Sequence, residues 1–308
     1  MNRMLLAILI ALIIGAQFPI AQVEGSQPSD LTGVNVAVYD GGEGISSEPR
    51  ESSAAALYWM FQWMNATVEM VNSSSIKQEG LSGFHIIAVP GGYAYNYYLD
   101  LGNSGANAII DFVADGGAYW GSCAGAYYAL EEFEWTEYEE TGTYYYGLGL
   151  FPGRGVGPIA DIADWPNYAM TDVLMNVSNE LIDFSQEPAT HSIMYYGGPF
   201  FETEGVDGIT TLATYSSNGM PAMIAFEYGQ GKVFLTGPHP EWEEDSFRDG
   251  SLWDNQLEEA GSEWNLCKEI SIWLASIESA NTEPVNLVLI VSIGVLALVL
   301  FLIWFSRR

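Results

Sequence analysis

Cys123 is the residue of this chain with the clearest capacity for covalent chemistry, in the stretch GGAYWGSCAGAYYALEEF at 116–133. An apolar run precedes it and small residues follow it, a pattern that predicts a strand turning sharply into a helix. The small residues that leave space for this turn are Gly121, Ala124 and Gly125. At a helix N-terminus the free amides and the dipole favour the thiolate, the nucleophilic form of cysteine. The alternative interpretation is a buried cysteine with a structural role.

A thiolate nucleophile needs a general base, and the sequence contains only three histidines. His85 opens an apolar strand and is interpreted as a core or edge residue, while His191 precedes a segment that could line a pocket. His239 lies just after a predicted strand, and Glu241 follows two residues later. In extended backbone these two side chains project to one side, so Glu241 could orient one ring nitrogen while the other faces the thiol. A zinc site with Cys123 is an alternative, although no ligand-spacing motif supports it.

Apolar strands and helices alternate through the first half of the chain and must position these residues. Continuous apolar strands indicate a parallel sheet with helices on both faces. The second half is richer in strands, with a hairpin turned at Gly229, Gln230 and Gly231, and it closes with a helical region at 252–279. We therefore expect an α/β fold with an open, mostly parallel, flavodoxin-like sheet. The predicted strands of the first half are 33–42, 66–72, 84–92 and 118–122, and its helices are 48–65 and 103–117.

Both ends of the chain carry apolar segments typical of targeting. Residues 1–21 combine a positive residue, an apolar run and small residues, as in a signal peptide, with an uncleaved helix as the alternative. Residues 285–305 contain no charge and match the ~20 residues that cross a bilayer, and arginines follow. We expect a domain at 33–279, a linker at 280–284, a membrane helix and a cytoplasmic stub at 306–308. The predicted location is the cell membrane, single-pass, with the main domain extracytoplasmic.

The chain is strongly acidic, with 39 Asp and Glu, 9 Lys and Arg and a formal net charge of −30. Such a charge repels nucleic acid and anionic lipid, so no nucleic-acid partner is expected. Two cysteines are present, and Cys267 lies in an apolar pattern with helical spacing, which is typical of a core residue. We expect both cysteines to be free thiols, although the exported location would permit a disulfide.

Four motifs, in the expected order, resemble the class I glutamine amidotransferase-like superfamily. The resemblance is closest to the family of biotin–protein ligase N-terminal domains, and it spans residues 33–275. It implies the amidotransferase-like α/β fold for nearly the whole predicted domain. The motifs are VPGGYAYNYY, GGAYWGSCAGAYYA, YYGGPFF and GPHPE.

The resemblance also implies roles for individual residues. In the superfamily the elbow cysteine is the nucleophile, and the histidine and glutamate of the H-P-E stretch complete a triad, which here are Cys123, His239 and Glu241. Backbone amides of Gly92 and Ala124 are implied to form an oxyanion hole. The substrate pocket is expected to contain Gly91, Tyr93, Arg154, Tyr196, Gly197 and Gly198.

The function expected from these features is a membrane-anchored, extracytoplasmic hydrolase or amidase that acts on an amide or γ-glutamyl-type bond of a small molecule or peptide. No cofactor is expected, and no synthetase domain that would consume ammonia is evident in the sequence. Arg154 could grip a substrate carboxylate, with an ordinary ion pair on an acidic surface as the alternative. The alternative function is a non-catalytic ligand-binding or cell-surface domain, since clustered tyrosines suit sugar or peptide binding.

The net charge of −30 predicts that salt stabilises the folded chain, because like charges repel more strongly when screening is weak. Thermal melts in a series of monovalent salt concentrations should show a midpoint that rises with ionic strength. A midpoint that falls as salt is added would contradict this prediction.

Overall fold

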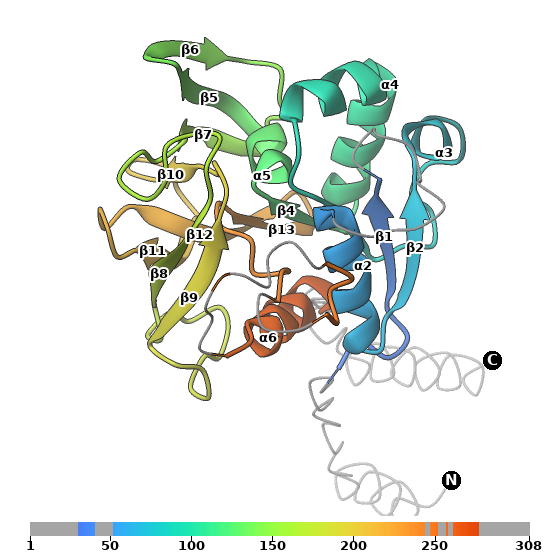
Figure 1. Cartoon of the computed structure of the whole chain (residues 1–308). Coiled ribbons are helices and arrows are strands. Elements are labelled where there is room, and N and C mark those ends of the chain that lie inside the picture. The colour runs from blue at the N-terminus through green and yellow to red at the C-terminus, as the bar shows by residue number, and fades with distance from the viewer. Residues whose placement is uncertain (1–29, 41–51, 244–246, 252–256, 258–260, 277–308) are drawn as a thin grey trace, which may run out of the picture.

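The computed structural model of the chain describes residues 30–40, 52–243, 247–251, 257 and 261–276 (Figure 1). Within these residues a large mixed sheet stands between helices on both of its faces, and a smaller sheet lies beside it. The α/β part of the predicted fold class fits this arrangement. Two other parts of that prediction, the strand directions and the membrane helix, need correction.

The large sheet has nine strands in the order β2-β1-β3-β4-β13-β12-β11-β8-β9. The first five of these pair in parallel, and the pairs from β13 onward are antiparallel. The strands are β1 Asn35–Tyr39, β2 Thr67–Val71, β3 Ile86–Val89, β4 Ala118–Ser122, β8 Ala169–Met175, β9 Thr190–Tyr195, β11 Thr210–Tyr215, β12 Pro221–Tyr228 and β13 Gly231–Thr236.

The prediction of a mostly parallel sheet is wrong for the second half of the chain. The predicted hairpin is confirmed, with Tyr228 of β12 paired to Gly231 of β13, and a tight turn of this kind forces antiparallel neighbours. Between β7 (Phe151–Gly157) and β13, the described chain contains no helix that could make a parallel crossover. The strands of this region therefore extend the sheet by antiparallel pairing.

Helices cover both faces of the large sheet (Figure 1). α2 and α6 pack on one face, α4 and α5 pack on the other, and α3 packs against α4. Their bounds are α2 Ser53–Trp63, α3 Ser73–Glu79, α4 Ala94–Ala114, α5 Ala124–Ala129 and α6 Trp264–Ala275.

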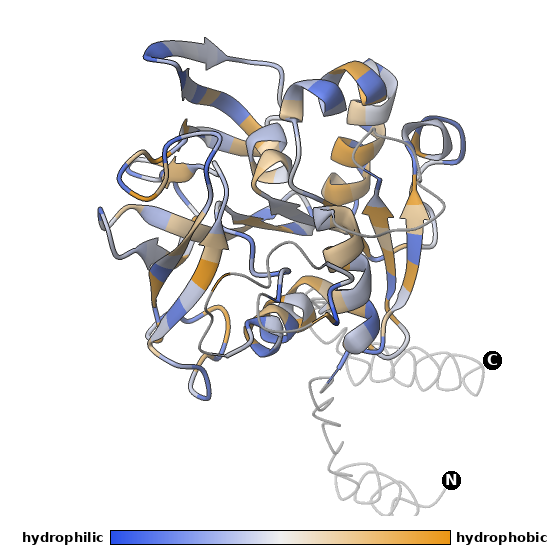
Figure 2. Ribbon diagram, viewed as in Figure 1, coloured by the Kyte–Doolittle hydropathy of each residue, from blue (hydrophilic) through white to orange (hydrophobic). Residues whose placement is uncertain are grey.

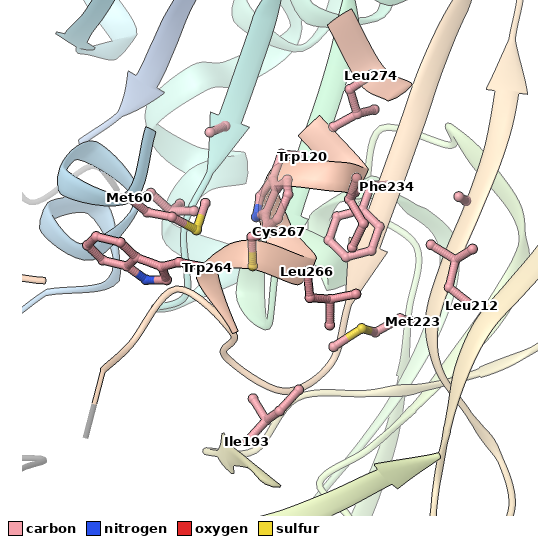
Figure 3. Close-up of a cluster of buried hydrophobic side chains, with 14 of the residues drawn as sticks. Met60, Trp120, Ile193, Leu212, Met223, Phe234, Trp264, Leu266, Cys267 and Leu274 are labelled. Atoms are coloured by element: carbon pink, nitrogen blue, oxygen red, sulfur yellow. The ribbon is translucent and has the colours of Figure 1, made fainter. Parts of the chain in front are cut away.

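Strand β1 illustrates how one strand serves two cores. Its side chains alternate in direction, so Val36 and Val38 join the cluster under α2 and α6, whereas Ala37 and Tyr39 join the cluster under α4. Figure 3 shows the first of these clusters, with Cys267 of α6 among apolar side chains. Cys267 is a fully buried core residue and both cysteines are free, as predicted.

The predicted membrane helix and membrane location are corrected. No helix in the described part of the chain is both long enough and apolar enough to cross a bilayer. α4, with 21 residues, is the longest helix described, but its backbone is kinked at Gly102 and its sequence is interrupted by polar residues. The predicted span at 285–305 lies outside the described residues, as do the segments 1–21, 280–284 and 306–308.

A smaller sheet of four strands, in the order β10-β7-β5-β6, packs beside α5 and the large sheet. In Figure 2 its strand β5 carries both hydrophilic and hydrophobic residues. None of these four strands is among those expected from the sequence. The strands other than β7 are β5 Leu130–Glu137, β6 Glu140–Tyr144 and β10 Phe200–Glu202.

Lys232 is a buried basic residue that ties β13 to the end of α6. Its ammonium donates to the carbonyls of Trp273 at 3.1 Å and Ser276 at 2.7 Å, and to the Ser276 hydroxyl at 2.6 Å. The last carbonyls of a helix have no intrahelical partner, and the helix dipole favours a cation there. The contact therefore fixes α6 against the strand that leads to His239.

Lys232→Met keeps most of the apolar stem but removes these donors, so we expect the free energy of unfolding to fall by about 1–3 kcal/mol. Urea denaturation monitored by tryptophan fluorescence measures the change. Lys77→Met is the control, because Lys77 is exposed and donates to a single carbonyl, that of Asp100, at 2.6 Å. Equal effects of the two substitutions would contradict the role given to Lys232.

Candidate active site

Cys123 occupies the turn between β4 and α5 in a conformation that residues with a side chain rarely adopt, with φ 49° and ψ −103°. Strain of this kind costs on the order of 1–3 kcal/mol and is concentrated at functional sites. A Cβ on Gly121 would lie 2.8 Å from the carbonyl oxygen of Gly125, and a Cβ on Gly125 would lie 2.1 Å from that of Val89. The Cys123 N–H donates to the Thr236 carbonyl at 2.9 Å. The chain therefore makes the sharp strand-to-helix turn that the small residues indicate.

The structure brings His239 and Glu241 together at the end of β13. Nδ1 of His239 lies 2.8 Å from Oε1 of Glu241, and both side chains are buried. β13 runs parallel to β4, with Thr236 paired to Ser122. The two strands therefore end side by side, and the loop that carries the histidine begins next to the elbow that carries Cys123.

The Glu241 carboxylate is held by two serines that the sequence analysis missed. The Ser53 hydroxyl donates to Oε1 at 2.6 Å, and the Ser122 hydroxyl donates to Oε2 at 3.0 Å. Ser53 in turn accepts the Gly91 N–H at 2.7 Å. Ser122 could have been noticed as a polar residue in a buried strand, whereas the sequence around Ser53 gives no indication of a role in the site. The fully buried carboxylate thus has donors from α2, β4 and the loop after β13.

The electrostatics of this group favour a protonated histidine. Burial disfavours the imidazolium, but the Glu241 carboxylate and Cys123 outweigh it and raise the pKa of His239 to about 10. Nε2 of His239 is buried. A cationic imidazole beside a thiol stabilises the thiolate, so the arrangement suits an activated cysteine.

The backbone at Gly91 and Gly92 passes too close to its neighbours for a side chain. A Cβ on Gly91 would lie 2.4 Å from Cε1 of His239, and one on Gly92, where φ is 148°, would lie 2.5 Å from a tyrosine hydroxyl. The Gly91 amide is already used in the serine network, so Gly92 is the candidate donor from this turn. Ala124 supplies the first amide of α5, and both residues line the cavity beside Cys123. The oxyanion hole stays a prediction.

A cavity of about 970 Å³ opens beside Cys123. The thiol lies 3.4 Å from the carbonyl oxygen of Tyr196, and the predicted pocket residues Gly91, Tyr93 and Tyr196 line the cavity. Much of the remaining wall is aromatic and was missed from the sequence, apart from the general observation that tyrosines cluster. It includes Trp135 and Tyr144 from the small sheet, Tyr146 from the segment after β6, and Trp165 and Tyr168 from the loop before β8.

Gly197 and Gly198 stand behind this wall and are not among the residues that line the cavity. A Cβ on Gly197 would lie 2.9 Å from the Trp165 ring, and one on Gly198 would lie 1.9 Å from the carbonyl oxygen of Gly237. Because they have no side chain, these glycines allow the Trp165 ring and the Gly237 backbone to pack closely against them, and in this way they shape the pocket.

Arg154 lies on β7 and is not among the residues that line the cavity. Its guanidinium contacts Glu132 at 3.1 Å, Glu202 at 3.9 Å and also Glu134. The alternative that the sequence analysis left open, an ordinary ion pair on an acidic surface, describes this residue. A role in gripping a substrate carboxylate has no support in this geometry.

The other two histidines lie outside the cavity wall. Nδ1 of His85 accepts the N–H of Asn35 at 2.9 Å at the start of β1, and His191 contacts Glu263 at 3.0 Å and Glu187 at 3.6 Å. Burial lowers the pKa of His191. Among the described residues, no group of three or more His, Cys, Asp or Glu side chains could hold a metal ion. These residues therefore provide no ligand set for the zinc site that was considered as an alternative.

The chain belongs to the family described as biotin–protein ligase, N terminal, whose model matches residues 34–270. The family predicted from the motifs is therefore confirmed. The biotin–protein ligase of Schizosaccharomyces pombe is 28% identical over 184 residues, which cover 57% of this chain and 28% of that protein. An uncharacterised protein of Chlamydia muridarum is 32% identical over 163 residues, covering 51% of this chain and 60% of that protein. The chain thus spans less than two thirds of the length of either relative.

Among solved structures, a glutamine amidotransferase from Thermotoga maritima is 15% identical and has a TM-score of 0.47, covering 80% of this chain and 99% of its own. A Thermoplasma acidophilum protein, described as a candidate component of GMP synthase, is 13% identical with a TM-score of 0.46, covering 78% of this chain and 94% of its own. At these values the likeness carries no inference about the chemistry of this chain.

The raised pKa of His239 predicts that its imidazolium persists through neutral pH and is lost near pH 10. The stability that this charge contributes is complete below its ordinary pKa of 6.5 and is lost as the pH rises through about 10. Glu241→Gln should lower the pKa of His239, because it removes the carboxylate that stabilises the cation. NMR titration of labelled histidines measures both values.

His191 serves as the internal control for this titration, since its depressed pKa arises from a different environment and should not respond to Glu241→Gln. A wild-type His239 that titrates near its ordinary pKa of 6.5 would refute the electrostatic coupling.

Proposed function

We propose that the chain is a cysteine-dependent hydrolase that cleaves an amide bond, with Cys123 as nucleophile, His239 as general acid and base, and Glu241 as the group that orients the imidazole. The observation that carries the proposal is the strained Cys123 elbow beside the buried His239–Glu241 pair, at the wall of an open cavity. The motif resemblance to glutamine amidotransferases supports an amide as the bond attacked. Cysteine nucleophiles with an oriented histidine are suited to acyl transfer.

In the first step the Cys123 thiolate forms a bond to the carbonyl carbon of the amide, and an electron pair moves onto the carbonyl oxygen. The N–H groups of Gly92 and Ala124 stabilise this oxyanion. When the oxyanion collapses, the C–N bond breaks and the His239 imidazolium gives its proton to the leaving nitrogen. The products are a thioester on Cys123 and a free amine or ammonia.

In the second step water attacks the thioester while the neutral His239 accepts a proton from it. A C–O bond forms, the C–S bond breaks, and the thiolate of Cys123 leaves beside the regenerated imidazolium. The acyl group departs as a carboxylic acid, which ionises in water. Glu241 keeps its hydrogen bond to Nδ1 throughout, so that Nε2 remains the nitrogen that exchanges the proton.

A ligand-binding domain without catalysis is the alternative function. The aromatic wall of the cavity supports it, because aromatic faces bind sugars, peptides and other flat or apolar groups without any reaction. The two functions differ in what they require of Cys123: the hydrolase needs a reactive thiolate, whereas the binding domain needs only the shape of the cavity.

Alkylation of the native full-length chain at neutral pH should therefore modify Cys123 much faster than Cys267. Cys267 is fully buried, and burial and the surrounding glutamates raise the pKa of its thiol well above the usual range. His239→Ala should slow the labelling of Cys123, while His85→Ala should leave it unchanged. Mass spectrometry of labelled peptides gives the rates. If both cysteines are labelled slowly and His239→Ala does not change the rate, the proposed hydrolase function is refuted.

Activity itself is tested by release of amine or ammonia from a panel of glutamine, γ-glutamyl, neutral and cationic amides. Cys123→Ala should abolish release, and Cys267→Ala, the matched substitution in the core, should retain it. A reactive Cys123 with no turnover of any amide in the panel would favour the binding domain.

A further inference from the structure

Aromatic rings form a continuous wall that begins at the nucleophile. The Cys123 thiol donates to the carbonyl of Tyr196, whose ring lies 5.2 Å from that of Trp165. The ring centroid of Trp165 also lies 5.1 Å from that of Trp135 and 6.3 Å from that of Tyr93. One indole thus contacts rings from three separate segments of the chain. All of these side chains line the cavity. Faces of such rings attract cations through their quadrupoles, and tryptophan does so most strongly.

Strand β5 places a carboxylate on the same side as this wall. Side chains along a strand alternate in direction, and Trp135 and Glu137 both line the cavity. Glu132 and Glu134, which alternate with Phe133 and Trp135 along the strand, instead contact Arg154. Glu132 and Glu134 are therefore paired with an arginine, whereas Glu137 lies beside the aromatic wall.

Two acidic side chains, Glu137 and Asp40, line the cavity. Glu137 stands directly opposite Glu140 in the β5–β6 hairpin, an arrangement that destabilises a strand pair unless a cation intervenes. Asp40, at the end of β1, adds a second acidic side chain to the lining. The described wall of the cavity contains no lysine or arginine, and the His239 imidazolium that also lines it is paired with the buried Glu241 carboxylate. The net charge of −30 on the chain adds a field that draws cations in and repels anions.

We propose that the cavity selects amide substrates that carry a positively charged group, such as a guanidinium or an alkylammonium, with Trp165 and Trp135 contacting the cation and Glu137 facing it. The proposal deepens the proposed function and rests on it for the reaction. It replaces the γ-glutamyl substrate that the sequence analysis expected, because a free carboxylate on the substrate would meet aromatic and acidic groups here.

Binding to the full-length Cys123→Ala chain tests this substrate class without requiring any turnover. Nα-acetylarginine amide and Nα-acetylcitrulline amide have nearly the same shape and differ in charge. We expect the arginine compound to bind about tenfold more tightly by calorimetry, which corresponds to about 1.4 kcal/mol. The difference should shrink as monovalent salt is added, because screening weakens the attraction.

Two pairs of variants in the same Cys123→Ala background localise the effect. Trp165→Leu should remove most of the preference for the arginine compound, whereas Trp59→Leu, at an exposed position on α2, should leave it intact. Glu137→Gln should weaken binding of the arginine compound roughly fivefold, in the range of exposed ion pairs. Glu131→Gln makes the same charge change on the same strand outside the cavity wall and should have little effect.

Equal binding of the two compounds, no detectable binding of either, or tighter binding of Nα-acetylglutamine with its free carboxylate would each overturn the proposal. Failure of the hydrolase is read separately, from labelling of Cys123 and from release of amine by the wild-type chain. If the cavity prefers the cationic compound but Cys123 is unreactive, the preference for cations would hold for ligands and only the catalytic function would be refuted.

Discussion

The buried carboxylate of Glu241 is the constraint on which the candidate site depends. A charge removed from water is tolerated only where partners replace the lost hydration, and here the partners are His239, Ser53 and Ser122. They come from three elements that meet only in the folded chain. Loss of a donor would leave the carboxylate under-solvated, so the contacts that complete the site also contribute to the stability of the fold.

The large sheet and α6 hold this group in register. Because β13 lies beside β4, the loop after β13 starts next to the elbow, and α6 then packs against that loop. The Trp264 indole donates to the carbonyl of Glu241 at 3.0 Å, and the Cys267 thiol lies 3.5 Å from the carbonyl of Pro240. The second cysteine of the chain is therefore a core residue that packs against this loop.

The small sheet has a different role from the large one. The large sheet provides the elbow and the histidine–glutamate pair, whereas β5 and β6 bring aromatic and acidic side chains to the cavity. Period-two alternation along β5 places Trp135 and Glu137 together on one face. The proposed chemistry and the proposed selectivity thus rest on separate elements, which is how one scaffold can serve different substrates.

The sequence by itself determined the features whose requirements are local. Small residues around Cys123 specify a tight turn, because such a turn depends only on neighbouring backbone. His239 and Glu241 do meet, but through a turn in which the Trp242 N–H donates to the His239 carbonyl at 3.3 Å, and not through the extended backbone expected from their spacing. The pairing of β8, β9 and β11 with the sheet, and the placement of Ser53 and Trp165, were decided by the tertiary structure alone. Ser53 meets Glu241 across 188 residues of sequence. No local pattern encodes such a contact, since it exists only after sheet pairing and helix packing have brought distant segments together.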